Sequence, residues 1–315
     1  MNTDRIRQVA IVGGTHGNEL TGVYLVKKFE QRPDLIQRSS FTTSTLLANP
    51  KALAVGKRYF DRDLNRCFSS QDLADARLTS YEENRAKDIY QLLGPKENPS
   101  VDFIIDLHST TANMGLTIIP SSNHPFNLRL AAYLSTVHPL VKIYRWSASN
   151  QENAFLRSIS KLGCTIEVGA VPQGVLQASC FQQTETLIHL ILDYLHAYNC
   201  GQATAVPSTF TIYQCVELVD YPRHQQDLQA MIHPQLQGKD YLPLYPDDPM
   251  FLTLDQQTIA YAGQSIVYPV FINEAAYYEK QIAMCLTERQ QIWLSETQTT
   301  QAIPLPARNP ENSQA

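Results

Sequence analysis

Residues 8–22 read QVAIVGGTHGNELTG, and their pattern is the first indication of the fold class of the protein. Its apolar start predicts a short buried strand that two glycines end, and the spacing of apolar residues in its second half predicts a helix. His16 and Glu19 lie three residues apart where the strand passes into the helix. On one helical turn both side chains can point toward the edge of a sheet where ligands usually bind.

The same alternation of strand and helix continues to about residue 200. Strands are predicted at 42–47, 101–107, 115–119, 141–146 and 164–168, and helices at 80–94, 126–137 and 181–198. Strands that alternate with helices indicate a mostly parallel sheet covered by helices, so the predicted fold class is α/β.

The chain changes character after Gly201. The small polar stretch QATAVPST is typical of a linker, and the segments after it, among them FTIYQCVEL, PMFLTL and SIVYPVFI, are rich in β-forming residues. We therefore expect an N-terminal domain over 1–201, a smaller, mainly β domain over 202–303, and a disordered Pro-rich tail over 304–315.

The composition excludes several classes of partner. Against 30 Asp and Glu the chain has 25 Lys and Arg, a formal net charge of −5, which provides no basic surface for nucleic acid or an acidic membrane. No apolar stretch approaches ~18 residues, the charged N-terminus is unlike a secretory signal, and the six cysteines form no CxxC pair. We expect a cytoplasmic protein that binds a small molecule, and a homo-oligomer stays open.

The HxxE pair becomes a candidate metal site when a third residue is added. The segment GGTHGNE lacks both the Gly-Lys-Ser/Thr of a phosphate loop and a GxGxxG, so it supports nucleotide binding only weakly. His16 and Glu19 alone favour a hydrogen-bonded histidine and a capping glutamate. His108, however, ends the buried run VDFIIDLH, at the same edge of the predicted sheet. Two histidines and one carboxylate leave a coordination position open on zinc, as catalytic sites do.

Other polar residues could complete a hydrolytic site at this edge. Glu167, in GCTIEVG, is a candidate general base, although a glutamate at a strand end is often only a surface residue. Arg58, Arg62 and Arg66 recur every four residues and could stabilise an anion, or could form a solvated loop paired with neighbouring aspartates. Arg157 lies on a short predicted helix before the strand of Glu167.

Six blocks in the right order resemble one known family. GGTHGNELTG, RYFDRDLNRCF, DLHSTTANMG, RSISKLGCTIEVG, PQGVL and NEAAYYEK are similar to the aspartoacylase and aminoacylase-3 group, and most to aspartoacylase, over about residues 9–280. This group belongs to the zinc carboxypeptidase-like superfamily of succinylglutamate desuccinylases. The resemblance implies a zinc-carboxypeptidase-like α/β/α N-terminal domain with a smaller, mainly β C-terminal domain over the active site.

The resemblance also implies a role for each matching residue. It makes the two histidines and the glutamate named above the ligands of one zinc per subunit. Glu167 matches the catalytic glutamate, and Arg58 the arginine that polarises the scissile carbonyl. Asn65 and Arg66 match the pair that holds the substrate carboxylate, and Arg157 matches the arginine that reads an acidic side chain.

The C-terminal domain and one departure bear on the substrate. Tyr277, in NEAAYYEK, matches a tyrosine that this domain brings into the site, whereas Asn153 stands where aspartoacylase has a tyrosine of the side-chain pocket. The function implied is zinc-dependent hydrolysis of N-acetyl-L-aspartate to acetate and L-aspartate. A deacylase of N-acetyl aromatic amino acids or mercapturates is the alternative, a zinc carboxypeptidase fits less well, and a zinc-binding module without turnover is the non-enzyme alternative.

Overall fold

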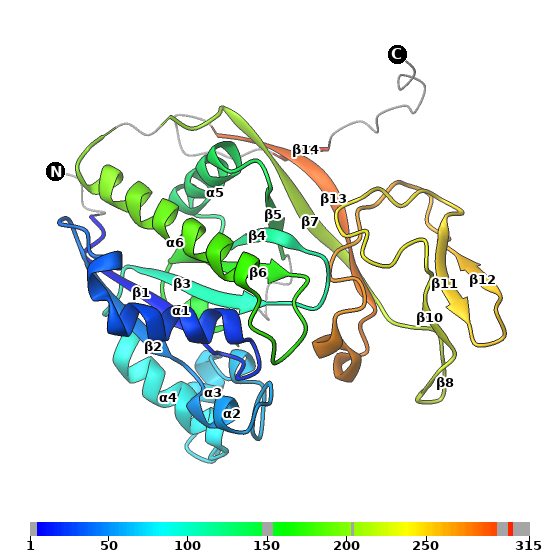
Figure 1. Cartoon of the computed structure of the whole chain (residues 1–315), viewed down its shortest axis with the longest axis horizontal. Helices are drawn as coiled ribbons and strands as arrows, with labels where there is room; N and C mark the ends of the chain where they lie inside the picture. The colour runs from blue at the N-terminus through cyan, green and yellow to red at the C-terminus, as the bar shows by residue number, and fades with distance from the viewer. Residues whose placement is uncertain (1–4, 147–153, 203–204, 295–301, 305–315) are drawn as a thin grey trace.

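A computed structural model describes residues 5–146, 154–202, 205–294 and 302–304 of the chain. Its strands are β1 (Gln8–Gly13), β2 (Thr42–Leu47), β3 (Phe103–Ser109), β4 (Gly115–Pro120), β5 (Val141–Arg145), β6 (Leu162–Gly169), β7 (Thr209–Val219), β8 (Arg223–His224), β9 (Asp227–Leu228), β10 (Ala230–Ile232), β11 (Pro249–Thr253), β12 (Thr258–Ala260), β13 (Met284–Trp293) and β14 (Ala302–Pro304). Nine of them form one sheet, in the order β14-β13-β7-β5-β4-β6-β3-β1-β2 (Figure 1).

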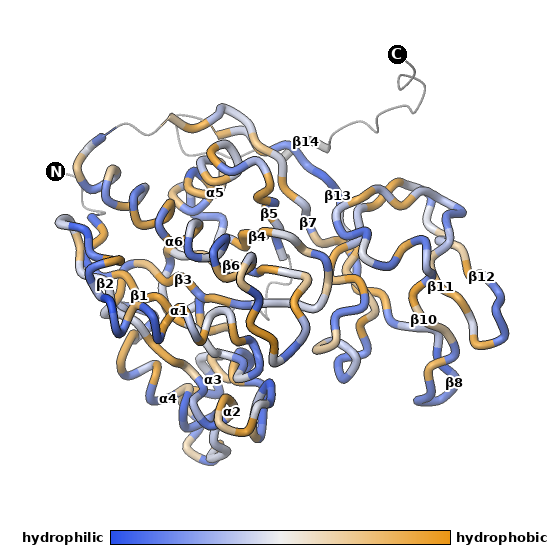
Figure 2. Tube along the Cα trace, in the orientation of Figure 1, coloured by the Kyte–Doolittle hydropathy of each residue, from blue (hydrophilic) through white to orange (hydrophobic). Residues whose placement is uncertain are grey.

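Helices cover both faces of this sheet. The α-helices are α1 (Leu20–Gln31), α2 (Pro50–Ala54), α3 (Ser70–Ala74), α4 (Tyr81–Leu93), α5 (Pro125–Val137) and α6 (Ala178–Asn199), and the 3₁₀ turns include η1 (Pro33–Ile36), η2 (Leu64–Arg66), η4 (Leu156–Ile159) and η5 (Ala275–Lys280). Successive residues of β1 belong to different hydrophobic clusters. Val9 and Ile11 pack with α1, α5 and α6, whereas Ala10 and Val12 pack with α4, η2 and η4. The alternation produces the predicted α/β/α layering, and the apolar residues follow the central strands (Figure 2).

The carboxyl ends of three parallel strands meet at one edge. β1 pairs in parallel with β2 and β3, and β3 pairs in parallel with β6. In this register Gly13 lies opposite Leu107, and His108 lies opposite Glu167. The residues that end β1, β3 and β6 are therefore neighbours in space, as the predicted parallel sheet requires. A capping box of Ser80 and Glu83 starts α4.

The C-terminal part joins the central sheet and also forms a smaller β unit. The long antiparallel pair of β7 and β13 extends the sheet beyond β5, although both strands lie in the predicted second domain. The short strands β10, β11 and β12 form a separate sheet with its own hydrophobic cluster. The predicted β segment 265–272 contains only two isolated bridges, at Val267 and Val270, which is fewer than its composition indicates. The residues from 305 onward lie outside the described ranges, so the disorder expected for the tail stays a prediction.

No helix within the described ranges is long and apolar enough to cross a lipid bilayer. The longest, α6, is amphipathic and buries one side against the sheet.

Candidate active site

Three side chains that can bind a metal converge at the carboxyl edge of the sheet. His16 and Glu19 follow β1, and His108 is the penultimate residue of β3. His16 Nδ1 lies 2.6 Å from Glu19 Oε1, and His108 Nδ1 lies 2.9 Å from Glu19 Oε2 and 3.2 Å from His16 Nδ1. All three are buried, with ligand atoms within 4.8 Å of one another. Across the described ranges, no other group of three His, Cys, Asp or Glu side chains has this geometry.

The turn that carries His16 packs tightly against α2. A Cβ atom at Gly17 would lie 2.2 Å from the backbone of Ala52 and Leu53, so only glycine fits this position. The Gly17 amide donates a hydrogen bond to the carbonyl of Arg58 at 3.0 Å. This contact joins the turn to the next functional segment of the chain.

A carboxylate holds the back of each imidazole. His16 Nε2 lies 3.0 Å from Asp63 Oδ1, and His108 Nε2 lies 3.0 Å from Asp106 Oδ2. Such pairs fix the tautomer and leave Nδ1 of each ring free to coordinate a metal. Sequence reasoning did not assign these aspartates to the site. For Asp106 a signal exists, because it lies two residues before His108 and so faces the same side of β3.

The donor set fits a divalent cation. Burial raises the pKa of Glu19, but the imidazoles of His16 and His108 outweigh burial and hold that pKa well below its ordinary value. The imidazoles of His16 and His108 are thus surrounded by three buried carboxylates, those of Glu19, Asp63 and Asp106. Two histidine nitrogens and one carboxylate oxygen are the ligands of many zinc sites that keep a position open.

Glu167 lies beside the metal-binding group. Glu167 is in β6, where it is the register partner of His108, and its side chain lines a cavity that His16 and His108 also line. Burial, with Glu19 and Glu274 nearby, raises the pKa of Glu167 to about 8 against the opposing effect of His108. A carboxyl group with such a pKa can exchange protons near neutral pH.

The arginines that recur every four residues separate into two environments. Arg58 donates to Glu19 Oε1 at 3.1 Å and to Asp63 Oδ2 at 3.4 Å, and its guanidinium borders the cavity. Arg62 instead forms ion pairs with Asp72 and Glu83 away from the cavity. Both arginines are thus ion-paired, but only Arg62 is solvated, because its side chain is 43% exposed whereas that of Arg58 is 15% exposed.

Two guanidinium groups lie against one aromatic ring inside the cavity. The guanidinium carbons of Arg66 and Arg157 lie 4.5 and 4.4 Å from the centroid of the Phe155 ring. Arg157 is buried, and its NH1 lies 3.4 Å from Thr165 Oγ1. This positive part of the cavity suits an anionic group of a ligand.

Asn65 connects two walls of the site. Its Oδ1 accepts a hydrogen bond from the Leu156 amide at 2.8 Å, which ties η4 to η2, and its Nδ2 lies 3.5 Å from His108 Nε2. Asn65 thus helps to position the turn that carries Arg157.

The C-terminal segment 274–280 covers the cavity. Tyr277 and Lys280 line it from η5, and Lys280 Nζ lies 2.9 Å from Asp63 Oδ2. The carboxylate of Glu274 accepts hydrogen bonds from the backbone amide of Thr111 at 2.7 Å and its hydroxyl at 2.9 Å, and so fastens the segment to the loop after β3. Sequence reasoning missed Glu274 and Lys280, although both lie in the same NEAAYYEK block as Tyr277.

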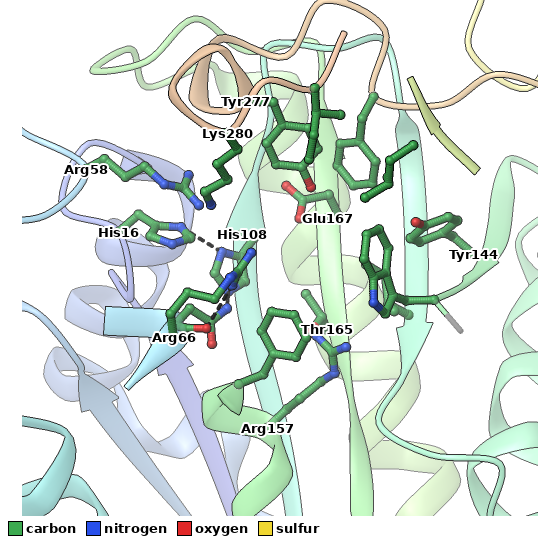
Figure 3. Close-up of a pocket in the computed structure, with 17 residues that line it drawn as sticks. His16, Arg58, Arg66, His108, Tyr144, Arg157, Thr165, Glu167, Tyr277 and Lys280 are labelled. Carbon is green, nitrogen blue, oxygen red and sulfur yellow. Dashed lines mark hydrogen bonds between the residues drawn. The ribbon is translucent and has the colours of Figure 1, made fainter. Parts of the chain in front are cut away.

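The cavity has a polar end and an apolar end. Its volume is about 440 Å³, and Figure 3 shows His16 and Arg58 on one side, Tyr144 on the other, and Tyr277 and Lys280 entering from the C-terminal segment. Its apolar lining consists of Ile119, Tyr144, Trp146, Phe155, Leu218, Phe271 and Ile282.

Nearly all the predicted site residues come together here. The cavity is lined by His16, Arg58, Asn65, Arg66, His108, Arg157, Glu167 and Tyr277. Glu19 contacts Nδ1 of both histidines. Asn153 lies outside the described residues.

Comparisons with known proteins match both parts of the chain. The sequence model of the succinylglutamate desuccinylase/aspartoacylase catalytic domain matches residues 5–195, and that of the AstE/AspA barrel-sandwich hybrid domain matches residues 208–289. A "Probable aspartoacylase" of Acaryochloris marina is 57% identical over 93% of this chain and 100% of its own length. An "N-acyl-aromatic-L-amino acid amidohydrolase (carboxylate-forming)" of Homo sapiens is 43% identical over 90% of this chain and 91% of its own.

The fold agrees as well. The crystal structure of murine aminoacylase 3 superposes with a TM-score of 0.88 at 40% identity, over 96% of this chain and 100% of that one. The matches cover both the catalytic and the C-terminal regions, and they confirm the resemblance stated from the sequence blocks. The chain therefore belongs to the succinylglutamate desuccinylase/aspartoacylase family.

Proposed function

We propose that this protein is a zinc-dependent hydrolase of N-acyl amino acids, with N-acetyl-L-aspartate as its substrate. One observation carries the proposal: Glu167 is the register partner of His108 and shares a cavity with the metal-binding group and with Arg58. A site built only to hold a structural metal needs neither an adjacent base nor a cationic cavity. The names of the relatives support cleavage of an N-acyl amino acid.

His16, Glu19 and His108 would hold the zinc. When bound, zinc supplies Lewis-acid polarisation of the acyl carbonyl and an activated water molecule. Asp63 and Asp106 keep both imidazoles turned toward the metal.

Glu167 acts as the proton carrier. It takes a proton from the attacking water and then delivers it to the nitrogen of the departing amine. Burial raises the pKa of Glu167 above the ordinary value of a glutamate, and a raised pKa suits the step in which the carboxyl group delivers its proton. Arg58, which lines the same cavity, donates to the oxygen that becomes negative as water adds to the carbonyl.

The arginines orient the substrate. Arg66, beside Asn65, binds the α-carboxylate, since a guanidinium can donate two parallel hydrogen bonds to a carboxylate. Arg157, whose guanidinium also lies against the Phe155 ring in this cavity, binds the side-chain carboxylate of an acidic substrate.

A second substrate class is favoured by the apolar end of the cavity. Tyr144, Trp146 and Phe271 line it, and an aromatic side chain would bury more apolar surface there than aspartate does. An N-acyl aromatic amino acid is therefore the alternative substrate, with the same proton transfers at Glu167.

Two measurements test the proposal. The first compares kcat/KM of the zinc-loaded protein on N-acetyl-aspartate and N-acetyl-tyrosine. A preference for N-acetyl-aspartate supports the proposed substrate, and a preference for N-acetyl-tyrosine selects the aromatic class. If the protein hydrolyses neither compound, the proposal is wrong.

The second measurement uses Glu167→Gln. We expect turnover to fall by at least about a hundredfold while bound zinc stays near one per chain, because only the proton carrier is removed. Unchanged turnover would refute the assigned role. Treatment of the wild type with a chelator should abolish activity, and zinc should restore it.

A further inference from the structure

The carboxylate of Asp63 has two differently occupied oxygens. Oδ1 lies 3.0 Å from His16 Nε2 and accepts a hydrogen bond from the backbone amide of Asn65, also at 3.0 Å. Oδ2 accepts Lys280 Nζ at 2.9 Å and a longer contact from Arg58 at 3.4 Å. The orientation of the carboxylate, and with it the orientation of the His16 ring, depends on what holds Oδ2.

Lys280 reaches Asp63 from a distant part of the chain. It is the last residue of η5, and its side chain is 21% exposed while that of Asp63 is 8% exposed. Glu274, at the start of the turn, fastens the segment to the loop after β3, and the backbone amide of Tyr277 donates to the Glu274 carbonyl at 2.9 Å. Lys280 is therefore in place only when the segment 274–280 is docked.

We propose that Lys280 is a positioning residue that couples docking of the segment 274–280 to metal binding, by holding Asp63 against His16. The proposal rests on the proposed function in one respect, that the group of His16, Glu19 and His108 binds zinc. Lys280 acts through Asp63, so it is not assigned contact with the reacting atoms.

The coupling works in both directions. Among the described residues, loss of the Lys280 ammonium leaves Asp63 Oδ2 with the longer Arg58 contact alone, so the carboxylate and the His16 ring are held less firmly. Direct removal of such an outer carboxylate lowers metal affinity by about 10–100-fold, and we expect about a fivefold loss for the residue one contact further out. By reciprocity, zinc must favour the docked segment by the same factor.

The test compares four full-length proteins in zinc affinity, by competition with a fluorescent chelator. Lys280→Met should bind zinc about fivefold more weakly than the wild type, and Lys280→Arg, which keeps the positive charge, should recover most of the affinity. Lys239→Met is the control, since Lys239 is exposed in the same C-terminal region and its substitution removes the same charge. Melting temperatures of the zinc-free proteins show whether each variant is folded.

Hydrogen exchange supplies a readout that simple destabilisation would not move. In the wild type, zinc should slow exchange in the segment 274–280, and Lys280→Met should lose most of that zinc-dependent protection while the control keeps it. Unchanged zinc affinity in Lys280→Met, including the case where only KM for an acidic substrate rises, would overturn the coupling alone. A wild type that binds no zinc would overturn this inference together with the proposed function.

Discussion

Removal of the Glu274 carboxylate should release the C-terminal segment from the active site. Glu274 is 4% exposed, and its Oε2 is shared by four donors: the Thr110 hydroxyl, the Thr111 amide at 2.7 Å, the Thr111 hydroxyl at 2.9 Å and the Ala112 amide at 3.3 Å. Oε1 accepts the Ala276 amide at 3.0 Å. The substitution Glu274→Ala removes the carboxylate that accepts from all these donors, and the Ala112 amide keeps its 3.1 Å hydrogen bond to Thr110 Oγ1.

The size of the loss follows from these contacts. A hydrogen bond to a charged group contributes about 1.5–3 kcal/mol, but donors that share one oxygen do not add, and water can enter the space that the carboxylate leaves. We expect the free energy of unfolding to fall by about 3–5 kcal/mol. Because the segment carries Tyr277 and Lys280, kcat/KM should also fall at least about tenfold, since misplaced groups near the reacting bond are costly.

Urea unfolding of the zinc-loaded protein measures the first effect, and initial rates on N-acetyl-aspartate measure the second. Glu274→Gln should lose less stability, because its amide oxygen can still accept while its NH₂ group opposes the remaining donors. Glu279→Gln is the matched control, since Glu279 is exposed in the same segment and, among the described residues, accepts a hydrogen bond from the Tyr59 hydroxyl alone. A Glu274→Ala protein within about 1 kcal/mol of the wild type would refute the reasoning.

Three further changes have defined outcomes. Asp106→Asn should lower zinc affinity by about 10–100-fold in chelator competition, because the amide no longer fixes the His108 tautomer; unchanged affinity would contradict this. Asn65→Ala should raise KM for N-acetyl-aspartate more than it lowers kcat, because the turn that carries Arg157 loses its tie; an effect on kcat alone would argue against it. Burial raises the pKa of Asp240 to about 6 from its ordinary 3.8, so its stabilising contribution is complete below pH 3.8 and is lost as the pH rises through 6. The free energy of unfolding in urea should therefore fall between pH 4 and 7 for the wild type relative to Asp240→Asn, by at most about 3 kcal/mol. A difference between the two proteins that does not change with pH would contradict the raised pKa of Asp240.

The core of the molecule and the group of His16, Glu19 and His108 were predictable from local sequence patterns. Strand and helix periods are local properties, and they predicted β1 to β6 and the long helices near their observed bounds. His16 and Glu19 are close in sequence, and His108 ends a strand whose partner the parallel topology predicts. The proximity of these three residues could be predicted because each lies at or just after the carboxyl end of a predicted strand.

The sequence blocks added residues that spacing could not find. Asn65 and Tyr277 entered through the resemblance, and the structure places both on the cavity wall. No periodicity marks either residue, because each acts from an irregular segment whose position depends on the elements that it contacts.

The charges that surround the metal-binding group come from distant parts of the chain and could not be predicted from local patterns. Lys280 and Asp63 are 217 residues apart in the sequence. Glu274 accepts a hydrogen bond from the backbone amide of Thr111, which is 163 residues away. The local sequence around each residue is compatible with an exposed charge. The contacts arise because β7 and β13 extend the central sheet and carry the C-terminal segment back over the edge where β1, β3 and β6 end. Contacts between such distant segments depend on how the whole chain packs, and no local pattern in the sequence encodes that packing.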